Sequence, residues 1–425
     1  MAYNFFAANV KNDAHMYIIR ISTSFSYFCG SMNNRQLFLR HVAQLSDAPL
    51  GLEIVKASGM YMWDADGKKI LDLIAGISVC NVGHSHPAVV QAIKDQAEQY
   101  MHLLVYGELV QSPQVAFATL LTQHLPASLD CVYFTNSGSE AVEGAMKLAK
   151  RYTGKSEIIA FNNSYHGSTQ GAMSIMGDEV WRNAYRPLLP DIQHLEYNSF
   201  ESLESITSRT ACVVAETVQA EAGVRVPQKE WLQALRAKCT ATGTLLILDE
   251  IQCGLGRNGT LWAFEQFGIT PDILLLGKAL GGGMPMGAFI ANREIMWVLT
   301  NNPVLGHMTT FGGHPVICAA GMAGFKVLLE QDLISSVKAK EQLFLKYLQH
   351  PAIRAVRSLG LMIAVEMENF AANKKVIDYC IDKGLLTDWF LFAPECLRIA
   401  PPLIITEEEI KQACDIILEA VRTVA

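Results

Sequence analysis

Short apolar runs without polar alternation are the feature that most constrains how this chain folds. Runs of this kind are typical of strands covered on both faces, as in a parallel sheet. Helical stretches such as Glu140–Tyr152 and Lys229–Thr242 separate several of them. The pattern therefore predicts an α/β fold with a mostly parallel sheet flanked by helices. The expected strands are Cys131–Phe134, Glu157–Phe161, Ala211–Ala215, Thr244–Leu248, Ile273–Leu276 and Ala288–Ala291.

The order of expected helices and strands changes near residue 321. From there on it predicts a smaller α+β domain at the C-terminus. Upstream, the stretch Gly59–Leu73 reads as a hairpin with Asp66-Gly67 at its turn, and the residues from Met32 onward read as an amphipathic helix. The elements expected after residue 321 are a long helix Met322–His350, a strand Leu361–Glu368, a helix Lys374–Lys383, a strand Cys396–Ile399 and a helix Thr406–Thr423.

These patterns divide the chain into four parts. We expect residues 1–31 to be an extension that is disordered or precedes the native start, and residues 32–84 to be a segment that joins the small domain. Residues 85–320 are the expected large domain and residues 321–425 the small one.

Composition excludes several classes of protein. The formal net charge is −7, without the basic excess of a nucleic-acid binder. No run reaches the roughly 20 uncharged apolar residues of a membrane span. The ten cysteines are scattered, and none has the spacing of a zinc site, so we expect free thiols in a reducing cytoplasm. The sequence thus predicts a cytoplasmic protein with no nucleic-acid, membrane or metal partner.

A loop of small residues follows the first expected strand and precedes a helix. In this loop Ser137, Gly138 and Ser139 allow backbone N–H groups to approach an anion at the helix N-terminus. The loop lacks the Gly-Lys-Ser/Thr element of a nucleotide-binding P-loop. It is therefore a candidate phosphate cradle, and a helix cap with a tight turn is the alternative.

Two charged residues stand at the ends of apolar strands. A buried carboxylate at Asp249 requires a cationic or metal partner, and a protonated pyridine nitrogen would meet that need. A lysine as close to a buried strand as Lys278 is costly unless its charge is removed or paired, and imine formation with an aldehyde removes it. A metal ligand of the Walker B type is the alternative for Asp249, although no Walker A loop accompanies it.

The pair Tyr165-His166 follows the strand Glu157–Phe161. An aromatic ring at a strand end can stack on a flat heterocycle, and the alternative is a tyrosine half buried beneath a loop. Each of these signals is moderate by itself. A phosphate loop, a stacking ring, an aspartate and a lysine at successive strand ends together match the needs of one kind of cofactor.

At these residues the sequence resembles the class III aminotransferases, the family of ornithine, acetylornithine and 4-aminobutyrate aminotransferases. The resemblance runs from about Ala48 to the C-terminus. It includes GMYMWDADGKKILDL, GHSHP at Gly83–Pro87, NSGSEA at Asn136–Ala141, YHG at Tyr165–Gly167, LDEIQCGLGRNG at Leu248–Gly259, GKALGGGMPMGA at Gly277–Ala288 and TTFGGHP at Thr309–Pro315.

The resemblance implies the pyridoxal-phosphate (PLP) fold of type I, with the cofactor in the large domain and held by Lys278 as a Schiff base. It implies that Asp249 pairs with the pyridine nitrogen and that Gly138 and Ser139 hold the phosphate. Thr310 would reach the phosphate of a neighbouring subunit, giving a homodimer with shared active sites. The remaining implied cofactor contacts are Tyr165 and Ile251 on the two ring faces, Gln252 on the ring hydroxyl, and Ser137 and His166 from the same loops.

For the substrate, the resemblance implies that Arg398 receives the α-carboxylate and that Glu221 is a gate that pairs with it. The family usually has an arginine that grips a distal carboxylate at the position of Ser168. Serine cannot replace a bidentate, charge-assisted contact, so we expect the distal end of the substrate to be bound differently here.

The implied activity is a ping-pong transfer of an amino group to a 2-oxo acid such as 2-oxoglutarate. The expected donors are ω-amino compounds such as ornithine, acetylornithine, 4-aminobutyrate or a related amine. Cofactor motifs alone leave open an aminomutase, racemase or decarboxylase. A PLP-binding protein without activity is disfavoured because Lys278 and Asp249 are both present, and an ATP- or NAD-dependent enzyme is disfavoured because both nucleotide fingerprints are absent.

Overall fold

The computed structural model of this protein describes residues 32–105 and 107–424. The predicted extension at residues 1–31 lies outside the described residues. Two compact units make up the chain, and we describe each by itself. The first contains the described residues up to Val55 and Asp64–Gly67, and the second contains Lys56–Trp63 and the chain from Lys68 onward.

In the first unit, helix α2 (Asn34–His41) confirms the helix expected after Met32. Its start is a capping box, in which the Asn33 side chain accepts a hydrogen bond from Gln36 N and the Gln36 side chain accepts one from Asn33 N. Two otherwise unpaired backbone donors of the first turn are satisfied in this way.

The second unit is built on a seven-stranded sheet in the order β4-β10-β9-β8-β7-β5-β6. The neighbours from β9 to β6 are parallel, whereas β10 is antiparallel to both β9 and β4. All six predicted strands are confirmed. Strand β6 was not predicted, because its sequence IQHL is short and half polar, as suits an edge strand. The strands are β4 (Cys131–Thr135), β5 (Glu157–Phe161), β6 (Ile192–Leu195), β7 (Thr210–Glu216), β8 (Leu245–Asp249), β9 (Ile273–Leu276) and β10 (Gly287–Ala291).

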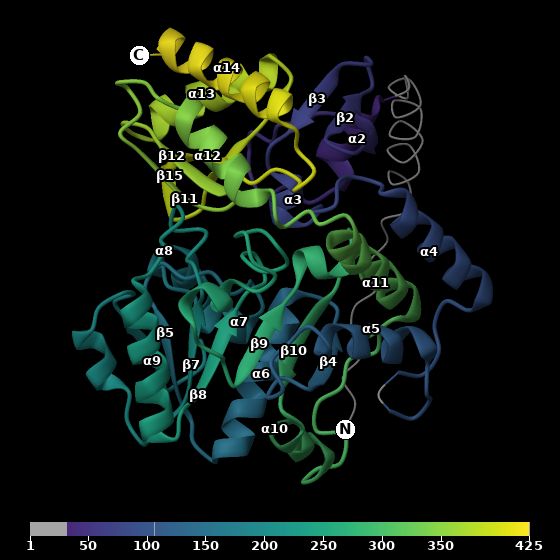
Figure 1. Cartoon of the computed structure of the whole chain (residues 1–425), viewed down its shortest axis with the longest axis vertical. Helices are drawn as coiled ribbons and strands as arrows, with labels where there is room; N and C mark the ends of the chain where they lie inside the picture. Colours follow the sequence, from purple (N-terminus) through teal and green to yellow (C-terminus); the bar gives the residue numbers. More distant parts are fainter. Residues whose placement is uncertain (1–31, 106, 425) are drawn as a thin grey trace, which may run out of the picture. The chain divides into compact units, whose positions relative to one another are not determined.

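Helices cover both faces of this sheet, which explains why its strands are apolar throughout (Figure 1). Ile158 belongs to one apolar cluster with helix α6 (Gly138–Thr153), whereas its neighbour Ile159 belongs to a second cluster with helix α9 (Lys229–Thr242). Successive strand residues point to opposite faces, so both faces need apolar side chains. The other helices of this region are α3 (Ala75–Ser78), α4 (Pro87–Gln99), α5 (Ser112–Thr122), α7 (Gln170–Ser174), α8 (Glu179–Arg182), α10 (Arg293–Trp297) and α11 (Pro315–Glu330).

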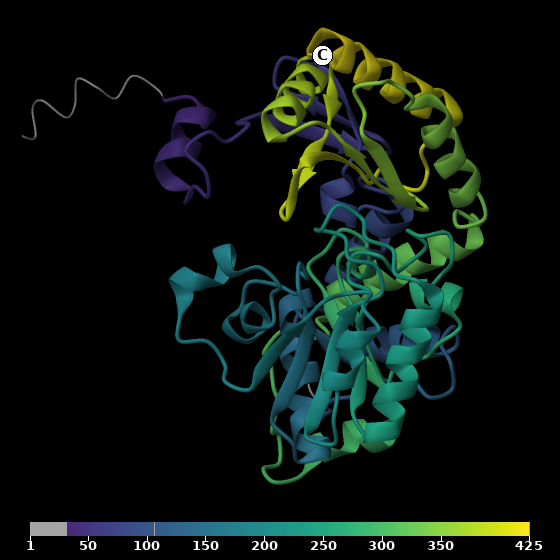
Figure 2. The same cartoon turned by 90° about the vertical axis from the view of Figure 1, so that its left-hand side faces the viewer.

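The C-terminal part of the second unit contains an antiparallel sheet in the order β11-β12-β15-β14. Figure 2 shows the C-terminal helix α14, in yellow, on the side of this sheet away from the large sheet. Its elements are β11 (Ala355–Leu359), β12 (Met362–Glu366), β14 (Asp388–Phe390), β15 (Ala393–Ile399), α12 (Val337–Tyr347), α13 (Phe370–Asp382) and α14 (Glu407–Val424).

The expected hairpin is confirmed as strands β2 and β3, which pair antiparallel. Strand β3 also pairs parallel with β13, so a segment near the N-terminus and one near the C-terminus share a sheet. The strands of this region are β1 (Ile54–Ser58), β2 (Tyr61–Asp64), β3 (Lys69–Asp72) and β13 (Leu385–Leu386).

The single long helix predicted for Met322–His350 is wrong. Helix α11 ends at Glu330 and helix α12 begins only at Val337. Between them Asp332 has a φ of 48°, the left-handed conformation that commonly terminates helices and that aspartate tolerates. The apolar pattern continues on both sides of this turn, so periodicity alone did not reveal the break.

Candidate active site

The carboxyl ends of the large-sheet strands bring the predicted cofactor residues to one cavity. Strand β4 runs in the same direction as β5, β7, β8 and β9, because it is antiparallel to β10, which is antiparallel to β9. The cavity at this edge has a volume of about 260 Å³. Every predicted cofactor residue except Thr310 lines this cavity. Thr310 is exposed and does not line it. The lining residues are Ser137, Gly138, Ser139, Tyr165, His166, Gly167, Glu216, Val218, Asp249, Ile251, Gln252, Cys253 and Lys278.

The small-residue loop has the tight packing that an anion cradle needs. Ser137 caps helix α6 by accepting a hydrogen bond from Glu140 N, and a Cβ atom added at Gly138 would lie 2.9 Å from the Ile251 side chain. Ser139 Oγ accepts a bond from Ser168 N at 3.0 Å. Backbone thus approaches the cavity closely at the N-terminus of a long helix, where the helix dipole favours a negative charge.

Asp249 is held between two donors at the end of β8. Its Oδ2 lies 2.7 Å from His166 Nδ1, and its Oδ1 accepts a bond from Ile251 N at 3.0 Å. The imidazole of His166 is fully buried, and its Nε2 has no partner among the described residues. The Asp249 carboxylate can accept a hydrogen bond from Nδ1–H, which fixes the orientation of the imidazole. His166 therefore acts as a support for the carboxylate.

Glu216 is a site residue that the sequence reasoning missed. It ends strand β7 directly beside Asp249 in the sheet register. Its carboxylate accepts bonds from Tyr165 N and Ala220 N, each at 2.9 Å. Burial, and then the charge of Asp249, raise the pKa of Glu216 well above its usual range. The signal was present in the sequence as an acidic residue that ends the apolar run ACVVAE.

Lys278 lies at the same edge in a strained backbone conformation. It opens a short turn after β9 with a φ of 46°. Its amine has no hydrogen-bond partner among the described residues. Burial lowers the pKa of the Lys278 ammonium, although the charge of Glu221 opposes the shift. A lysine amine of this kind is more readily neutral and nucleophilic than an exposed one.

Helix α3, which contacts the turn after Lys278, contains a run of left-handed residues. Ala75, Gly76, Ile77 and Ser78 all have φ between 49° and 64°. The conformation is costly for a β-branched residue such as Ile77. Strain of this kind concentrates at functional sites, where the surrounding structure holds it in place.

Glu221 and Arg398 form a buried ion pair, as the resemblance implied. Arg398 on β15 donates two bonds to the Glu221 carboxylate, at 2.7 and 3.0 Å, and a third to Asp388 Oδ1 at 2.8 Å. Burial alone would lower the pKa of Arg398, but the two carboxylates raise it. Gln252 Nε2 lies 3.4 Å from Glu221 Oε1 and links the pair to the cavity.

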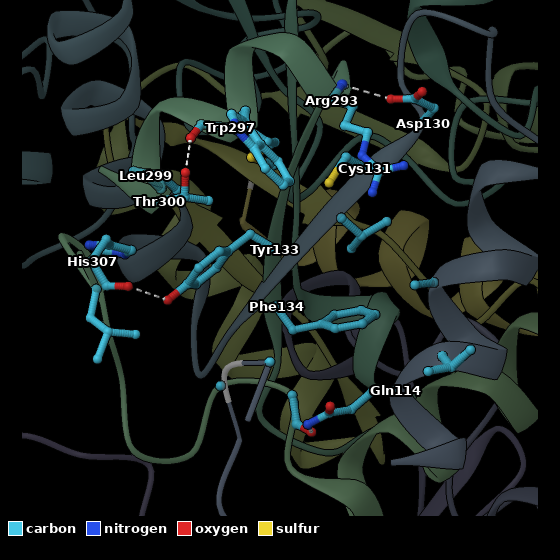
Figure 3. Close-up of a pocket in the computed structure, with 18 of the residues that line it drawn as sticks. Gln114, Asp130, Cys131, Tyr133, Phe134, Arg293, Trp297, Leu299, Thr300 and His307 are labelled. Atoms are coloured by element: carbon cyan, nitrogen blue, oxygen red, sulfur yellow. Dashed lines mark hydrogen bonds between the residues drawn. The ribbon is translucent and has the colours of Figure 1, made fainter. Parts of the chain in front are cut away.

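A larger hollow of about 680 Å³ lies elsewhere on the second unit (Figure 3). Aromatic and aliphatic side chains dominate its lining, and Tyr133 Oη donates a bond to His307 O across it. In its lining the backbone N–H of Arg293 donates a hydrogen bond to the Asp130 carboxylate. It lacks the lysine and the two buried carboxylates of the smaller cavity. The smaller cavity is therefore the candidate active site, since ionisable groups with shifted pKa values cluster at functional sites.

Known proteins have sequences similar to that of this chain. Residues 42–421 match the family model described as aminotransferase class-III. The acetylornithine aminotransferase of Methanopyrus kandleri is 39% identical over 397 residues, which cover 92% of this chain and 99% of the relative. Ornithine aminotransferase 1 of Staphylococcus aureus is 38% identical, covering 86% of this chain and 93% of the relative.

A solved structure gives the same result for the fold. The ornithine aminotransferase from Toxoplasma gondii, with partial occupancy of PLP at its active site, superimposes with a TM-score of 0.83. It is 29% identical, and the match covers 95% of this chain and 98% of that one.

The fold and the cavity define a PLP-dependent enzyme of fold type I. The cavity fits this cofactor, because it combines an anion cradle at Gly138, a buried carboxylate at Asp249 and a lysine with a lowered pKa at Lys278. The chain belongs to the class III aminotransferase family, and it is a PLP-dependent transaminase.

Proposed function

We propose that this enzyme transfers an amino group from an ω-amino donor to a 2-oxo acid such as 2-oxoglutarate. The candidate donors are ornithine, acetylornithine, 4-aminobutyrate and related amines, in keeping with the names of the relatives. The observation that carries the proposal is the Lys278 amine, buried with a lowered pKa in the same cavity as Asp249 and Glu216. Two half-reactions would follow one another, with the donor product leaving before the 2-oxo acid enters.

The site residues would divide the work of holding PLP. Lys278 Nζ would bind its aldehyde carbon covalently, and Asp249 would keep a proton on the ring nitrogen. Gly138 and Ser139, with Ser137 in the same loop, would receive the phosphate at the start of α6. Tyr165 and Ile251 would pack on the two faces of the PLP ring, and Gln252 would bond to its hydroxyl. His166 would support Asp249 through the contact at Nδ1.

The chain's own groups would then move the proton. When bound, PLP supplies an electron-accepting ring that stores the electrons released as the donor Cα–H bond breaks. The donor amine would replace Lys278 Nζ on the cofactor. The freed Nζ would then accept the proton from the donor Cα and donate it to C4′ of the cofactor. The lowered pKa of Lys278 favours this role, because a neutral amine can accept a proton.

Arg398 would bind the α-carboxylate of the 2-oxo acid, and Glu221 would leave it at that moment. The guanidinium is already held in a bidentate geometry by Glu221, which is the geometry that a substrate carboxylate requires. A substrate without a carboxylate at this position would leave the pair closed. One site would in this way accept a carboxylate in one half-reaction and an amine in the other.

A homodimer with shared active sites would cover the large hollow. Apolar side chains gather on its lining and on the segments beside it, and Thr310 lies on the same stretch of chain. Large exposed apolar surfaces mark interfaces. We expect light scattering to give twice the mass of one chain, and Val304→Asp to shift the protein toward the monomer. Within residues 101–115 and 297–311, the large apolar side chains that are more than half exposed are Met101, Leu104, Val110, Val115, Trp297, Val304, Met308 and Phe311.

We also propose the four-part division at residues 31, 84 and 320 and a cytoplasmic location. None of the described helices has both the length and the apolar character needed to cross a membrane. Fractionation of cells that express the chain tests the location. Limited proteolysis tests the boundaries at residues 31 and 84, whereas the boundary at residue 320 lies within helix α11, where cleavage should require local unfolding.

The activity is tested by following the visible absorbance of bound PLP, near ~420 nm in its lysine-bound form. A true donor should remove this band, and a 2-oxo acid should restore it. Turnover without any 2-oxo acid would contradict the proposal and point to an aminomutase, racemase or decarboxylase. A panel of ω-amino donors, each tested with 2-oxoglutarate, identifies the substrates.

A further inference from the structure

A series of aromatic rings leads outward from the cofactor cavity. Tyr165 lines the cavity, and its ring centroid lies 6.5 Å from that of Phe392. Phe392 in turn lies 6.4 Å from Trp181 on α8, with the rings at 71°. The indole of Trp181 is 44% exposed, so the series ends in solvent. These three side chains, which we call the aromatic wall, form a series of neighbouring rings that starts at the cavity lining and ends at the exposed Trp181.

Three arginines on the segments that carry this wall are paired with carboxylates. Arg182, the last residue of α8, bonds to Glu179 at 2.8 Å and to His194, and Arg186, beyond the helix, bonds to the same Glu179. On the other side, Arg398 is held by Glu221. A carboxylate beside the wall would have to break one of these pairs, because a bare carboxylate is costly to desolvate.

Ser168 adds no charge at this place. It is exposed, and its hydroxyl lies 3.4 Å from Tyr165 Oη. A neutral hydroxyl can accept or donate a hydrogen bond but cannot balance a carboxylate. The part of the wall nearest the cavity is therefore aromatic and neutral.

The position of Phe392 depends on the gate. Leu391 N donates to Glu221 Oε2, and Phe392 N donates to Glu221 O, each at 3.0 Å. The loop between β14 and β15 is thus fixed to Glu221 while Glu221 is paired with Arg398. When a 2-oxo acid displaces Glu221 from Arg398, the bond from Leu391 N is lost with it. The wall is complete in the closed state of the gate, the state that we assign to the donor.

We propose that the distal end of the amino donor packs against Phe392 and Trp181, the part of the aromatic wall beyond Tyr165. The preferred donors are then ω-amines whose far end is uncharged and largely apolar, such as an alkyl, aryl or amide group. This proposal rests on the proposed function, because it names the donor class for the same site. Apolar contact with aromatic rings supplies the affinity, and the pairing of Arg182, Arg186 and Arg398 disfavours a carboxylate.

Donors that differ only at the far end test the proposal. The probes are 4-aminobutyrate, its amide 4-aminobutanamide, and 3-phenylpropylamine. The readout is kcat/KM for the loss of the visible PLP band in single-turnover mixing with the PLP-loaded enzyme. We expect the amide and the phenyl donor to exceed 4-aminobutyrate by about tenfold or more.

Variants of the wall should change this preference. Phe392→Ala and Trp181→Ala should each lower kcat/KM for 3-phenylpropylamine by about tenfold while 4-aminobutyrate changes by less than about twofold. Matched controls are Phe370→Ala, whose ring contacts Trp389, and Tyr185→Ala, which is 57% exposed on the segment after α8. Both controls should keep the wild-type ratio. Phe392→Leu keeps an apolar side chain and should retain part of the preference for 3-phenylpropylamine that Phe392→Ala loses.

The ratio of two donors on one enzyme sample does not depend on the folded fraction, so a destabilised variant still gives an answer. A wild-type preference for 4-aminobutyrate, or an unchanged ratio in both wall variants, would overturn the donor class while leaving the transaminase assignment intact. The proposed function itself would fail in a different way, with no amine removing the PLP band from the loaded enzyme.

Discussion

Two clusters of buried charge lie close together in this enzyme and differ in how well they are paired. At the strand ends, Asp249, Glu216 and Lys278 share a cavity, and the lysine amine has no hydrogen-bond partner among the described residues. In the gate, Arg398 makes four hydrogen bonds to Glu221, Asp388 and the carbonyl of Trp389.

The difference shows how each cluster meets its ligand. In the strand-end cluster the Lys278 amine and His166 Nε2 lack partners among the described residues, and a ligand with complementary groups relieves the cost of burying them. The gate is already satisfied, so a carboxylate binds there only by replacing Glu221 on Arg398. The first arrangement favours tight, permanent binding of a cofactor. The second favours selection among substrates by competition.

The largest effect is expected from removing the unpaired amine. Lys278→Met should lower kcat by at least about 10³-fold, because both the covalent link and the proton carrier are lost. Thermal unfolding of the PLP-free protein should not become easier, since a buried group with a lowered pKa is replaced by an apolar one. A marked loss of stability would show that the lysine is a structural residue.

The second-largest effect is expected from Asp249 in the same cluster. Asp249→Asn keeps the size of the side chain but cannot hold a proton on the ring nitrogen, so kcat should fall by about 10²-fold or more. Steady-state kinetics at saturating PLP measures this. His166→Asn is the milder comparison, because it removes only the support at Nδ1. Equal losses in the two variants would show that orientation, and not charge, is what Asp249 provides.

In the gate, Arg398→Lys should affect the acceptor more than the donor. Lysine lacks the bidentate geometry that holds Glu221 and that would hold a 2-oxo acid, so kcat/KM for 2-oxoglutarate should fall by about 10²-fold. The donor half-reaction of an apolar amine should change far less. Single-turnover kinetics of the two halves separates these effects, and equal losses in both would contradict the assigned role.

Glu250, the residue after Asp249, extends the comparison into the core. Its carboxylate accepts bonds from Thr217 Oγ1, Ala263 N and Phe264 N, yet burial raises its pKa from 4.5 to about 7. The folded state therefore binds a proton more tightly than the unfolded state. The contribution of Glu250 to the free energy of unfolding is greatest below pH 4.5. It falls by about 3 kcal/mol as the pH rises to 7.

Melting temperatures of wild type and Glu250→Gln across this pH range test that sign. The melting temperature of the variant should rise relative to that of the wild type as the pH rises. A difference that is constant with pH would show that Glu250 is ionised in the folded protein throughout the range.

The smallest expected change is a gain. Ser168→Arg places a cation beside the aromatic wall and should raise kcat/KM for 4-aminobutyrate by about tenfold relative to its amide. Ser168→Gln, of similar length but neutral, is the control. The two donors compared on one enzyme give the measurement, and an unchanged ratio would mean that the distal end of the donor lies elsewhere.

Local pattern predicted the strands and the strand-end residues well, because a parallel sheet fixes where Asp249, Lys278 and the loop at Gly138 must meet. Other features depend on contacts distant in sequence. The contact of Trp181 with Phe392 joins α8 to the loop after β14, and no periodicity announces it. The Glu221–Arg398 pair was expected only from the family resemblance.

Errors arose where local signals were weak. Strand β6 is short and partly polar, and Asp332 ends α11 within an apolar pattern that continues on both sides. Glu216 was overlooked although it ends an apolar strand as Asp249 does. The rule that selected Asp249 would have selected Glu216 as well, had it been applied to every strand end.

The most direct test of the central claim is to locate the covalently held cofactor. Borohydride reduction of the purified, PLP-loaded enzyme turns a lysine–PLP link into a stable amine, and peptide mass spectrometry then identifies the modified residue. The account predicts one stoichiometric adduct, on Lys278, and none at that position in Lys278→Met. A stoichiometric adduct on another lysine, or none in protein that holds PLP, would contradict it.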